Sequence, residues 1–94
     1  MRLTDEQISL LKNKLKSLSS EAKIYLFGSR VDDTKKGGDI DLLIISDILT
    51  KKDLRQIRLA FFEKFGEQKL DLLLDKSELK NPFSKYIFEK AVLL

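Results

Sequence analysis

The spacing of apolar residues along the chain predicts which segments are helices and which are strands. Apolar residues recur every three or four positions in three segments that are predicted to be helices, at residues 4–18, 51–65 and 83–94. Three shorter apolar runs are predicted to be strands, at residues 22–27, 39–46 and 68–74. Cap residues mark the helix starts at Thr4, Thr50 and Asn81-Pro82, and Gly66 is placed to end the second helix.

The order of these elements predicts the fold class. A helix is followed by two strands, a helix, a strand and a last helix, with a loop at residues 29–38 in which a short helix could begin at Ser29. The connections are long enough for parallel as well as antiparallel pairing, so we expect an α+β fold with a small mixed β-sheet and helices packed on it. The strand at 39–46 is apolar on both faces and is expected at the centre of the sheet. Residues 1–94 are expected to form a single domain.

Residue types that are missing from the chain narrow the possible chemistry. The sequence has no cysteine, which excludes disulfides and thiolate metal sites, and no histidine, which excludes imidazole ligands and histidine bases. Any metal must therefore be held by oxygen atoms, which favours Mg²⁺, Mn²⁺ or Ca²⁺. The net charge of +3 comes without a block of basic residues, so direct nucleic-acid binding is not expected. No apolar run approaches the roughly 20 residues of a membrane span, and no signal peptide is recognisable, so we expect a cytoplasmic location without membrane contact.

Aspartates interrupt two of the predicted strands, at positions where apolar residues would be expected. Asp39 and Asp41 are two positions apart in "GGDIDLLI", so on a strand both side chains share a face, with Cα atoms about 6–7 Å apart. Asp71 interrupts the third strand in the same way and joins the pair if the two strands are neighbours. Three carboxylates in one patch repel one another, and divalent cations compensate this repulsion, so we predict a two-metal Mg²⁺ site on these aspartates. A single aspartate at a strand start is often only a cap on a loop or an edge-strand charge, and Asp75 is predicted to be a loop residue.

A glycine and a serine follow the first predicted strand, in "LFGSR". Gly28 permits a positive φ and lets the backbone approach a ligand closely. If a short helix begins at Ser29, its free N–H groups suit phosphate oxygens, and Arg30 could add a bidentate contact to phosphate. The chain has neither a P-loop motif nor a Rossmann fingerprint. We therefore predict that Gly28, Ser29 and Arg30 bind the phosphates of a nucleoside triphosphate, next to metal ions on the aspartates.

The composite pattern "FGSR…GGDIDLLI…LDLLL" resembles the minimal nucleotidyltransferases of the DNA polymerase β superfamily. The resemblance covers about residues 22–75. It implies a polymerase-β-type core, with the nucleotide-phosphate turn at Gly28 and Ser29 and the metal-binding, catalytic carboxylates at Asp39, Asp41 and Asp71. It also implies the reaction, in which a nucleotidyl group passes from ATP or another nucleoside triphosphate to a hydroxyl group and pyrophosphate is released.

Small proteins of this kind resemble the antitoxin half of HEPN/MNT toxin–antitoxin pairs, where MNT denotes the minimal nucleotidyltransferase. HEPN proteins are small, all-helical RNases. The resemblance implies such a toxin as partner, neutralised by transfer of AMP from ATP to one of its hydroxyl groups, typically on a tyrosine. The alternative is an antitoxin that binds a nucleotide or its partner and acts by occlusion, without catalysis. We expect the apolar last helix to pack on the chain's own sheet, although its end could also seal a homo- or hetero-oligomer.

Overall fold

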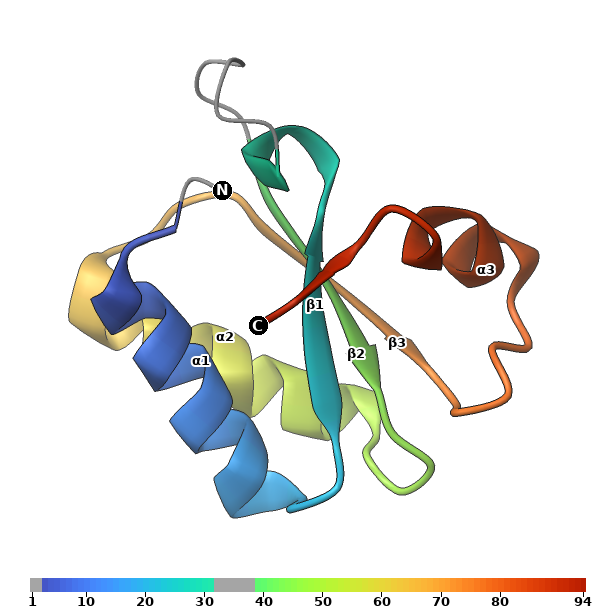
Figure 1. The fold of residues 1–94 in the computed structure, drawn as a ribbon. Helices are drawn as coiled ribbons and strands as arrows, with labels where there is room; N and C mark the ends of the chain where they lie inside the picture. Colours follow the sequence, from blue (N-terminus) through green and yellow to red (C-terminus); the bar gives the residue numbers. More distant parts are fainter. Residues whose placement is uncertain (1–2, 32–38) are drawn as a thin grey trace.

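The computed structural model describes residues 3–31 and 39–94 and shows an α+β fold (Figure 1). The predicted order of elements is confirmed, with one strand added near the C-terminus. The elements are α1 (Asp5–Leu18), β1 (Lys23–Phe27), the 3-10 helix η1 (Gly28–Val31), β2 (Ile40–Ile45), α2 (Lys51–Phe65), β3 (Leu70–Asp75), α3 (Pro82–Phe88) and β4 (Val92–Leu93).

The strands form a mixed sheet in the order β3-β2-β1-β4. β2 is antiparallel to β1 on one side and parallel to β3 on the other. This arrangement confirms the mixed sheet and the central position of β2. The parallel register is important for the site, because it pairs Asp41 directly with Asp71.

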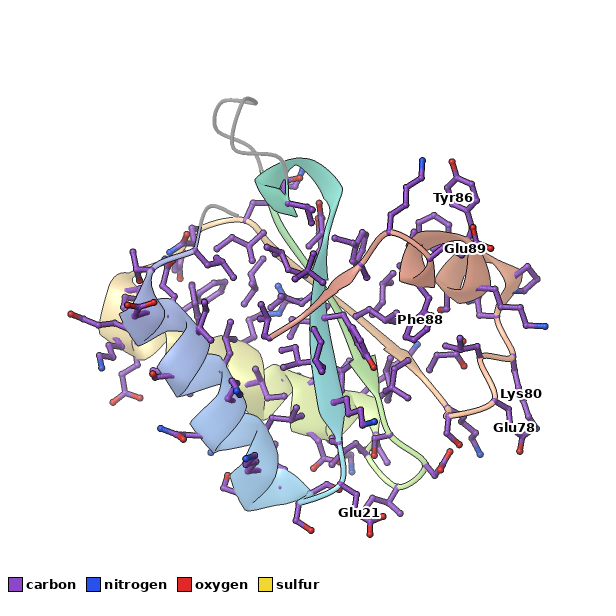
Figure 2. The ribbon with its side chains drawn as sticks, in the orientation of Figure 1. Glu21, Glu78, Lys80, Tyr86, Phe88 and Glu89 are labelled. Carbon is purple, nitrogen blue, oxygen red and sulfur yellow. The ribbon has the colours of Figure 1, made fainter. Side chains whose placement is uncertain are left out.

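Helices lie on both faces of the sheet (Figure 1). The main hydrophobic core lies between the sheet and the helices α1 and α2, and its buried members are Leu11, Leu15, Ile24, Leu26, Ile40, Leu42, Ile44, Leu54, Ile57, Phe61 and Leu70. On the other face α3 packs against β1, where the rings of Tyr25 and Phe88 meet edge to face with centroids 5.0 Å apart. Figure 2 shows Phe88 pointing from α3 towards the sheet, whereas Tyr86 points away from it. Because strand side chains alternate, Asp41 and Asp71 point to this second face, away from the main core.

Capping residues define the helix boundaries that the sequence predicts. At the start of α1, the Thr4 hydroxyl accepts a hydrogen bond from the N–H of Gln7 at 3.1 Å, and the Gln7 side chain accepts one from the N–H of Thr4 at 3.0 Å. This reciprocal pair is a capping box. At the end of α2, Gly66 adopts a φ of +83° and its N–H donates to the carbonyl oxygen of Phe62 at 2.8 Å. The boundaries of these helices therefore follow from local sequence.

The C-terminal segment differs from the predicted helix over 83–94. The helix α3 ends at Phe88, and Val92–Leu93 form β4, antiparallel to β1. The N–H of Leu94 also donates to the carbonyl oxygen of Ile24 at 3.0 Å. The physical reason is the edge of β1, whose backbone groups gain hydrogen-bond partners when the chain folds back onto them. The apolar end of the chain therefore packs on its own sheet.

Asp75 also differs from its prediction, because it is the buried last residue of β3 rather than a loop residue. Its carboxylate accepts hydrogen bonds from the N–H groups of Lys76 at 2.7 Å and Asn81 at 3.0 Å. Burial alone would raise the pKa of Asp75, but these hydrogen bonds, together with one from Ser84, outweigh burial and lower the pKa. The ionised carboxylate thus holds the connection between β3 and α3 in place.

Replacing Asp75 with alanine is expected to lower the free energy of unfolding by about 1–3 kcal/mol, because two N–H groups lose a buried acceptor. Since the pKa of Asp75 is lowered by folding, its contribution is present above about pH 4 and is lost as the pH falls through the folded pKa. Urea unfolding of the wild type and the variant at neutral and at strongly acidic pH measures this contribution. The two proteins should differ less in acid, and an equal difference at both pH values would contradict a role for the ionised carboxylate.

Candidate active site

Three aspartates come together at one end of the sheet, where the neighbouring strands β2 and β3 begin. Asp41 on β2 lies beside Asp71 on β3, and Asp39 precedes β2 by one residue. One carboxylate oxygen from each aspartate lies within 4.8 Å of the others. Asp39 and Asp41 are half-buried, whereas Asp71 is exposed. The structure therefore brings together all three carboxylates that the sequence singled out.

Gly28 packs against the carboxylate of Asp41. It directly follows Phe27, the β1 residue that pairs with Asp41. Its φ of +79° lies in the region that favours glycine. A Cβ atom added at Gly28 would overlap Oδ2 of Asp41 and would lie 3.2 Å from its Cγ. Gly28 therefore leaves room for a carboxylate of the cluster. The contact with a ligand that the sequence suggested stays a prediction.

The carboxylate of Asp41 is repelled by the two other carboxylates of the cluster. Burial, a hydrogen bond with Asp71 and the negative charges of Asp71 and Asp39 raise the pKa of Asp41 to about 6. Lys69 acts in the opposite direction, because its Nζ lies 3.4 Å from Oδ2 of Asp39 and its charge lowers the pKa of Asp41. This lysine is exposed, so water screens its charge and it offsets only part of the repulsion. The arrangement favours a bound divalent cation, since carboxylate oxygens are the ligands that Mg²⁺ prefers.

The sequence matches a family model over most of its length. Residues 8–94 fit the model of the nucleotidyltransferase domain, a range that includes Gly28 and the three aspartates. The chain belongs to the nucleotidyltransferase domain family.

Solved structures support the assignment of this nucleotidyltransferase domain. The crystal structure of a protein described as a candidate nucleotidyltransferase superposes with a TM-score of 0.58 and 26% sequence identity, covering 93% of this chain and 96% of that chain. No curated protein sequence matches the chain significantly. Fold and family together agree with the polymerase-β-type core that the sequence pattern indicates.

Family membership assigns nucleotidyl transfer in general to this chain, and with it a nucleotide substrate. The nucleotidyltransferase fold typically uses a divalent metal, and the cluster of Asp39, Asp41 and Asp71 offers the oxygen donors for one. Within residues 3–31 and 39–94, no helix is long and apolar enough to cross a membrane.

The phosphate-binding residues predicted next to Gly28 are described only in part. The segment Gly28–Val31 forms η1, a single 3-10 turn that contacts β2. A short helix at this place is thus confirmed, but it is one turn long, so individual N–H groups rather than a long helix dipole would face a ligand. The side chains of Ser29 and Arg30 lie outside the described part of the structure, so their contact with phosphate stays a prediction.

Lys69 is a residue of the site that sequence reasoning missed. It precedes β3 by one residue and lies two positions before Asp71, so the two side chains share a face. This spacing is visible in the sequence. The register that pairs Ile40 with Leu70, and so places Lys69 beside Asp39, is decided only by the pairing of β2 with β3.

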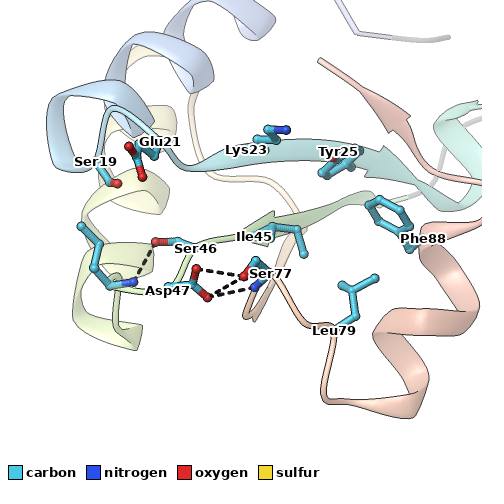
Figure 3. Close-up of a pocket in the computed structure, with 11 residues that line it drawn as sticks. Ser19, Glu21, Lys23, Tyr25, Ile45, Ser46, Asp47, Ser77, Leu79 and Phe88 are labelled. Carbon is cyan, nitrogen blue, oxygen red and sulfur yellow. Dashed lines mark hydrogen bonds between the residues drawn. The ribbon is translucent and has the colours of Figure 1, made fainter.

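A separate pocket of about 380 Å³ lies at the opposite end of β2 (Figure 3). It is lined by residues from the start of β1, the end of β2 and the connection between β3 and α3. In this pocket Asp47 accepts hydrogen bonds from the N–H of Ser77 at 3.0 Å and from its hydroxyl at 2.9 Å, and these bonds lower the pKa of Asp47. Neither Gly28 nor any of the three clustered aspartates lines the pocket. This pocket is therefore separate from the carboxylate cluster, and its Asp47 carboxylate ties the end of β2 to the connection between β3 and α3.

Proposed function

We propose that this nucleotidyltransferase transfers AMP from ATP to a hydroxyl group of a partner protein, with Mg²⁺ held by Asp39, Asp41 and Asp71. The observation that supports this most directly is the convergence of the three carboxylates within 4.8 Å of one another, with Asp41 against the Gly28 turn. Shared carboxylate ligands of this kind suit a pair of divalent ions.

The proposed transfer forms a bond between the acceptor oxygen and the α-phosphorus of ATP. The bond from that phosphorus to the oxygen that bridges to the β-phosphate breaks, and pyrophosphate leaves with the electron pair. The proton of the acceptor hydroxyl passes to water. Mg²⁺ bound at the carboxylates supplies charge neutralisation for the phosphates. Asp71 is the exposed member of the three aspartates, and in this proposal it would orient the incoming hydroxyl. The N–H groups of the Gly28 turn would bind the phosphates, together with Ser29 and Arg30.

The proposed partner is a small helical toxin of the HEPN type, for which this chain acts as a cytoplasmic antitoxin. The resemblance of the sequence to minimal nucleotidyltransferases supports this partner. Exposed apolar side chains on α3 and β4 are consistent with contact to another protein, since Phe83, Tyr86 and Leu93 are 53%, 69% and 57% exposed.

Transfer of label from α-labelled ATP tests the proposed function. Where the adjacent gene encodes a small helical protein, the chain would be incubated with Mg²⁺, labelled ATP and that protein, and compared with the variant Asp39→Asn/Asp41→Asn. We expect label on the partner with the wild type only, loss of that label when EDTA removes the metal, and loss of RNase activity in the labelled partner.

Two other outcomes decide against this proposal. A stable complex that silences the partner with either chain, without label, would show an antitoxin that acts by occlusion. Equal labelling by the wild type and the double variant would exclude the aspartates from catalysis.

A further inference from the structure

The outer edge of β3 offers backbone hydrogen-bonding groups to another strand. Within the part of the chain that the structure describes, β3 pairs only with β2 and ends the sheet. The carbonyl oxygens of Lys69 and Asp75 accept hydrogen bonds from the N–H groups of Ile40 and Ser46, at 3.1 and 3.0 Å. In a parallel ladder the N–H and C=O of one residue point the same way, so the odd-numbered residues of β3 face β2. The backbone groups of the even-numbered residues, Leu72 and Leu74 among them, therefore point outward.

A groove of about 600 Å³ runs along this outer edge, between β3 and α2. Its apolar wall is formed by Leu54, Leu72, Leu73 and Leu74. Three cations line the groove with no carboxylate among the lining residues: Lys51, Arg55 and Arg58, all from α2. None of these cations forms an ion pair with a carboxylate within the described residues. The groove thus combines a strand edge, an apolar wall and positive charge.

The side chain of Arg58 occupies the first outward-facing position of the β3 edge. Its guanidinium donates a hydrogen bond to the carbonyl oxygen of Leu70, the first outward-facing group of β3. This contact covers the start of the edge with a charged side chain, which is one way that proteins protect a sheet edge from unwanted pairing. Arg58 does not cover Leu72 and Leu74, which lie further along β3. Arg55, which lies nearer the start of α2, is therefore available to a ligand at this part of the edge.

We infer that the groove between β3 and α2 binds an extended acidic segment of a partner polypeptide, which adds to the sheet as a fifth strand. Backbone pairing with Leu72 and Leu74 would supply affinity, as in other cases of strand addition, and the cations would select for acidic side chains. A second copy of this chain fits poorly, because pairing two β3 edges would bring two sets of α2 cations towards each other. This inference does not depend on nucleotidyl transfer.

The two faces of the sheet predict the pattern of the bound segment. On one face its side chains would meet Lys51 and Arg55 of α2, so acidic residues belong there. On the other face they would lie next to the side of β3 that carries Asp71, so acidic residues are unfavourable there. Because strand side chains alternate between faces, the expected segment has an acidic residue at every second position.

A capped, fluorescent peptide of sequence Thr-Glu-Val-Glu-Thr-Glu-Val tests the inference, without ATP or metal. We expect saturable binding by anisotropy that weakens as salt is added, and slower hydrogen exchange at the amides of Leu72 and Leu74 when the peptide is bound. The exchange measurement separates strand addition from loose electrostatic attraction. A peptide of the same composition without alternation, Glu-Glu-Thr-Thr-Val-Val-Glu, should bind at least about tenfold more weakly.

Matched variants of the protein locate the binding surface. The double variant Lys51→Glu/Arg55→Glu should bind the alternating peptide at least about tenfold more weakly than the wild type. The control Lys12→Glu/Lys16→Glu makes the same change in net charge with the same spacing on α1, and should bind normally. Urea unfolding confirms that both variants fold.

Three results would overturn the inference. The first is equal binding of the two peptides, and the second is unchanged exchange at Leu72 and Leu74. The third is evidence that another molecule occupies the groove. Either a ten-nucleotide oligouridylate would bind the groove more tightly than the peptide, or sedimentation would show a dimer that Lys51→Glu/Arg55→Glu disrupts.

Discussion

Replacing Asp41 with asparagine is expected to reduce nucleotidyl transfer about a thousandfold or more. Asp41 is the central carboxylate of the cluster, paired with Asp71 and packed against Gly28. Loss of its charge would remove a ligand of the proposed divalent ions, and a loss of about 4 kcal/mol of transition-state stabilisation corresponds to a thousandfold in rate. Pyrophosphate release under saturating ATP and Mg²⁺ measures the change.

The same substitution is expected to stabilise the metal-free protein. Folding raises the pKa of Asp41 from 3.8 to about 6, so between about pH 4 and pH 6 the folded state holds a proton that the unfolded state releases. Stability therefore falls as the pH rises through this window, and the loss is complete above it. An asparagine at this position carries no charge, so it avoids this loss of stability. Because Asp41 is partly exposed and its charge is screened by water, we expect the free energy of unfolding to rise by only about 1 kcal/mol at pH 7. In a domain of this size that gain raises the Tm by about 4–8 °C.

Mg²⁺ and a control variant separate the two effects of Asp41→Asn. Saturating Mg²⁺ should stabilise the wild type more than the variant, because ligand binding to the folded state adds to its stability. The control Asp47→Asn changes an aspartate of the separate pocket and should leave transfer and the Mg²⁺ effect unchanged. A variant Asp41→Asn that is less stable than the wild type without metal, or that keeps its activity, would contradict the electrostatic account of the cluster.

Replacing Gly28 with alanine is expected to lower the rate of transfer about a hundredfold or more, although no charge is changed. The added Cβ would overlap Oδ2 of Asp41, so the carboxylate has to move. Displacing a catalytic group by about 1 Å can lower the rate of an enzyme about a hundredfold. The positive φ of +79° adds backbone strain, which we expect to lower the free energy of unfolding by about 1–3 kcal/mol. Steady-state kinetics and urea unfolding measure the two effects.

Gly66 supplies a matched control for Gly28→Ala. Its φ is +83°, close to that of Gly28, but an added Cβ would meet no atom within 4 Å. Gly66→Ala should therefore lose stability through backbone strain and keep the wild-type rate of transfer. If both alanine variants lose activity equally, strain alone explains the loss, and the contact of Gly28 with Asp41 is not needed for catalysis.

Most secondary structure could be predicted because local interactions decide it. The helix at residues 51–65 has the predicted bounds, with its apolar stripe in the core and Gly66 at its end. The strand β4 could not be predicted, because "AVLL" suits a helix as well as a strand and only the edge of β1 selects between them. Asp75 was assigned to a loop for a similar reason, since its hydrogen bonds to Lys76 and Asn81 depend on the path of the chain after β3.

The sequence by itself determined the fold class and the order of the main elements. It also indicated that the three aspartates and the glycine turn form the candidate site. These follow from the periods of apolar residues and from charges within strands, which are local properties of the chain. Only the tertiary structure decided that β3 pairs in parallel with β2, and this register places Asp71 beside Asp41 and Lys69 beside Asp39. It also decided that Gly28 packs against the Asp41 carboxylate. The reason is that strand neighbours and registers arise from contacts between segments distant in sequence, and no single segment contains that information.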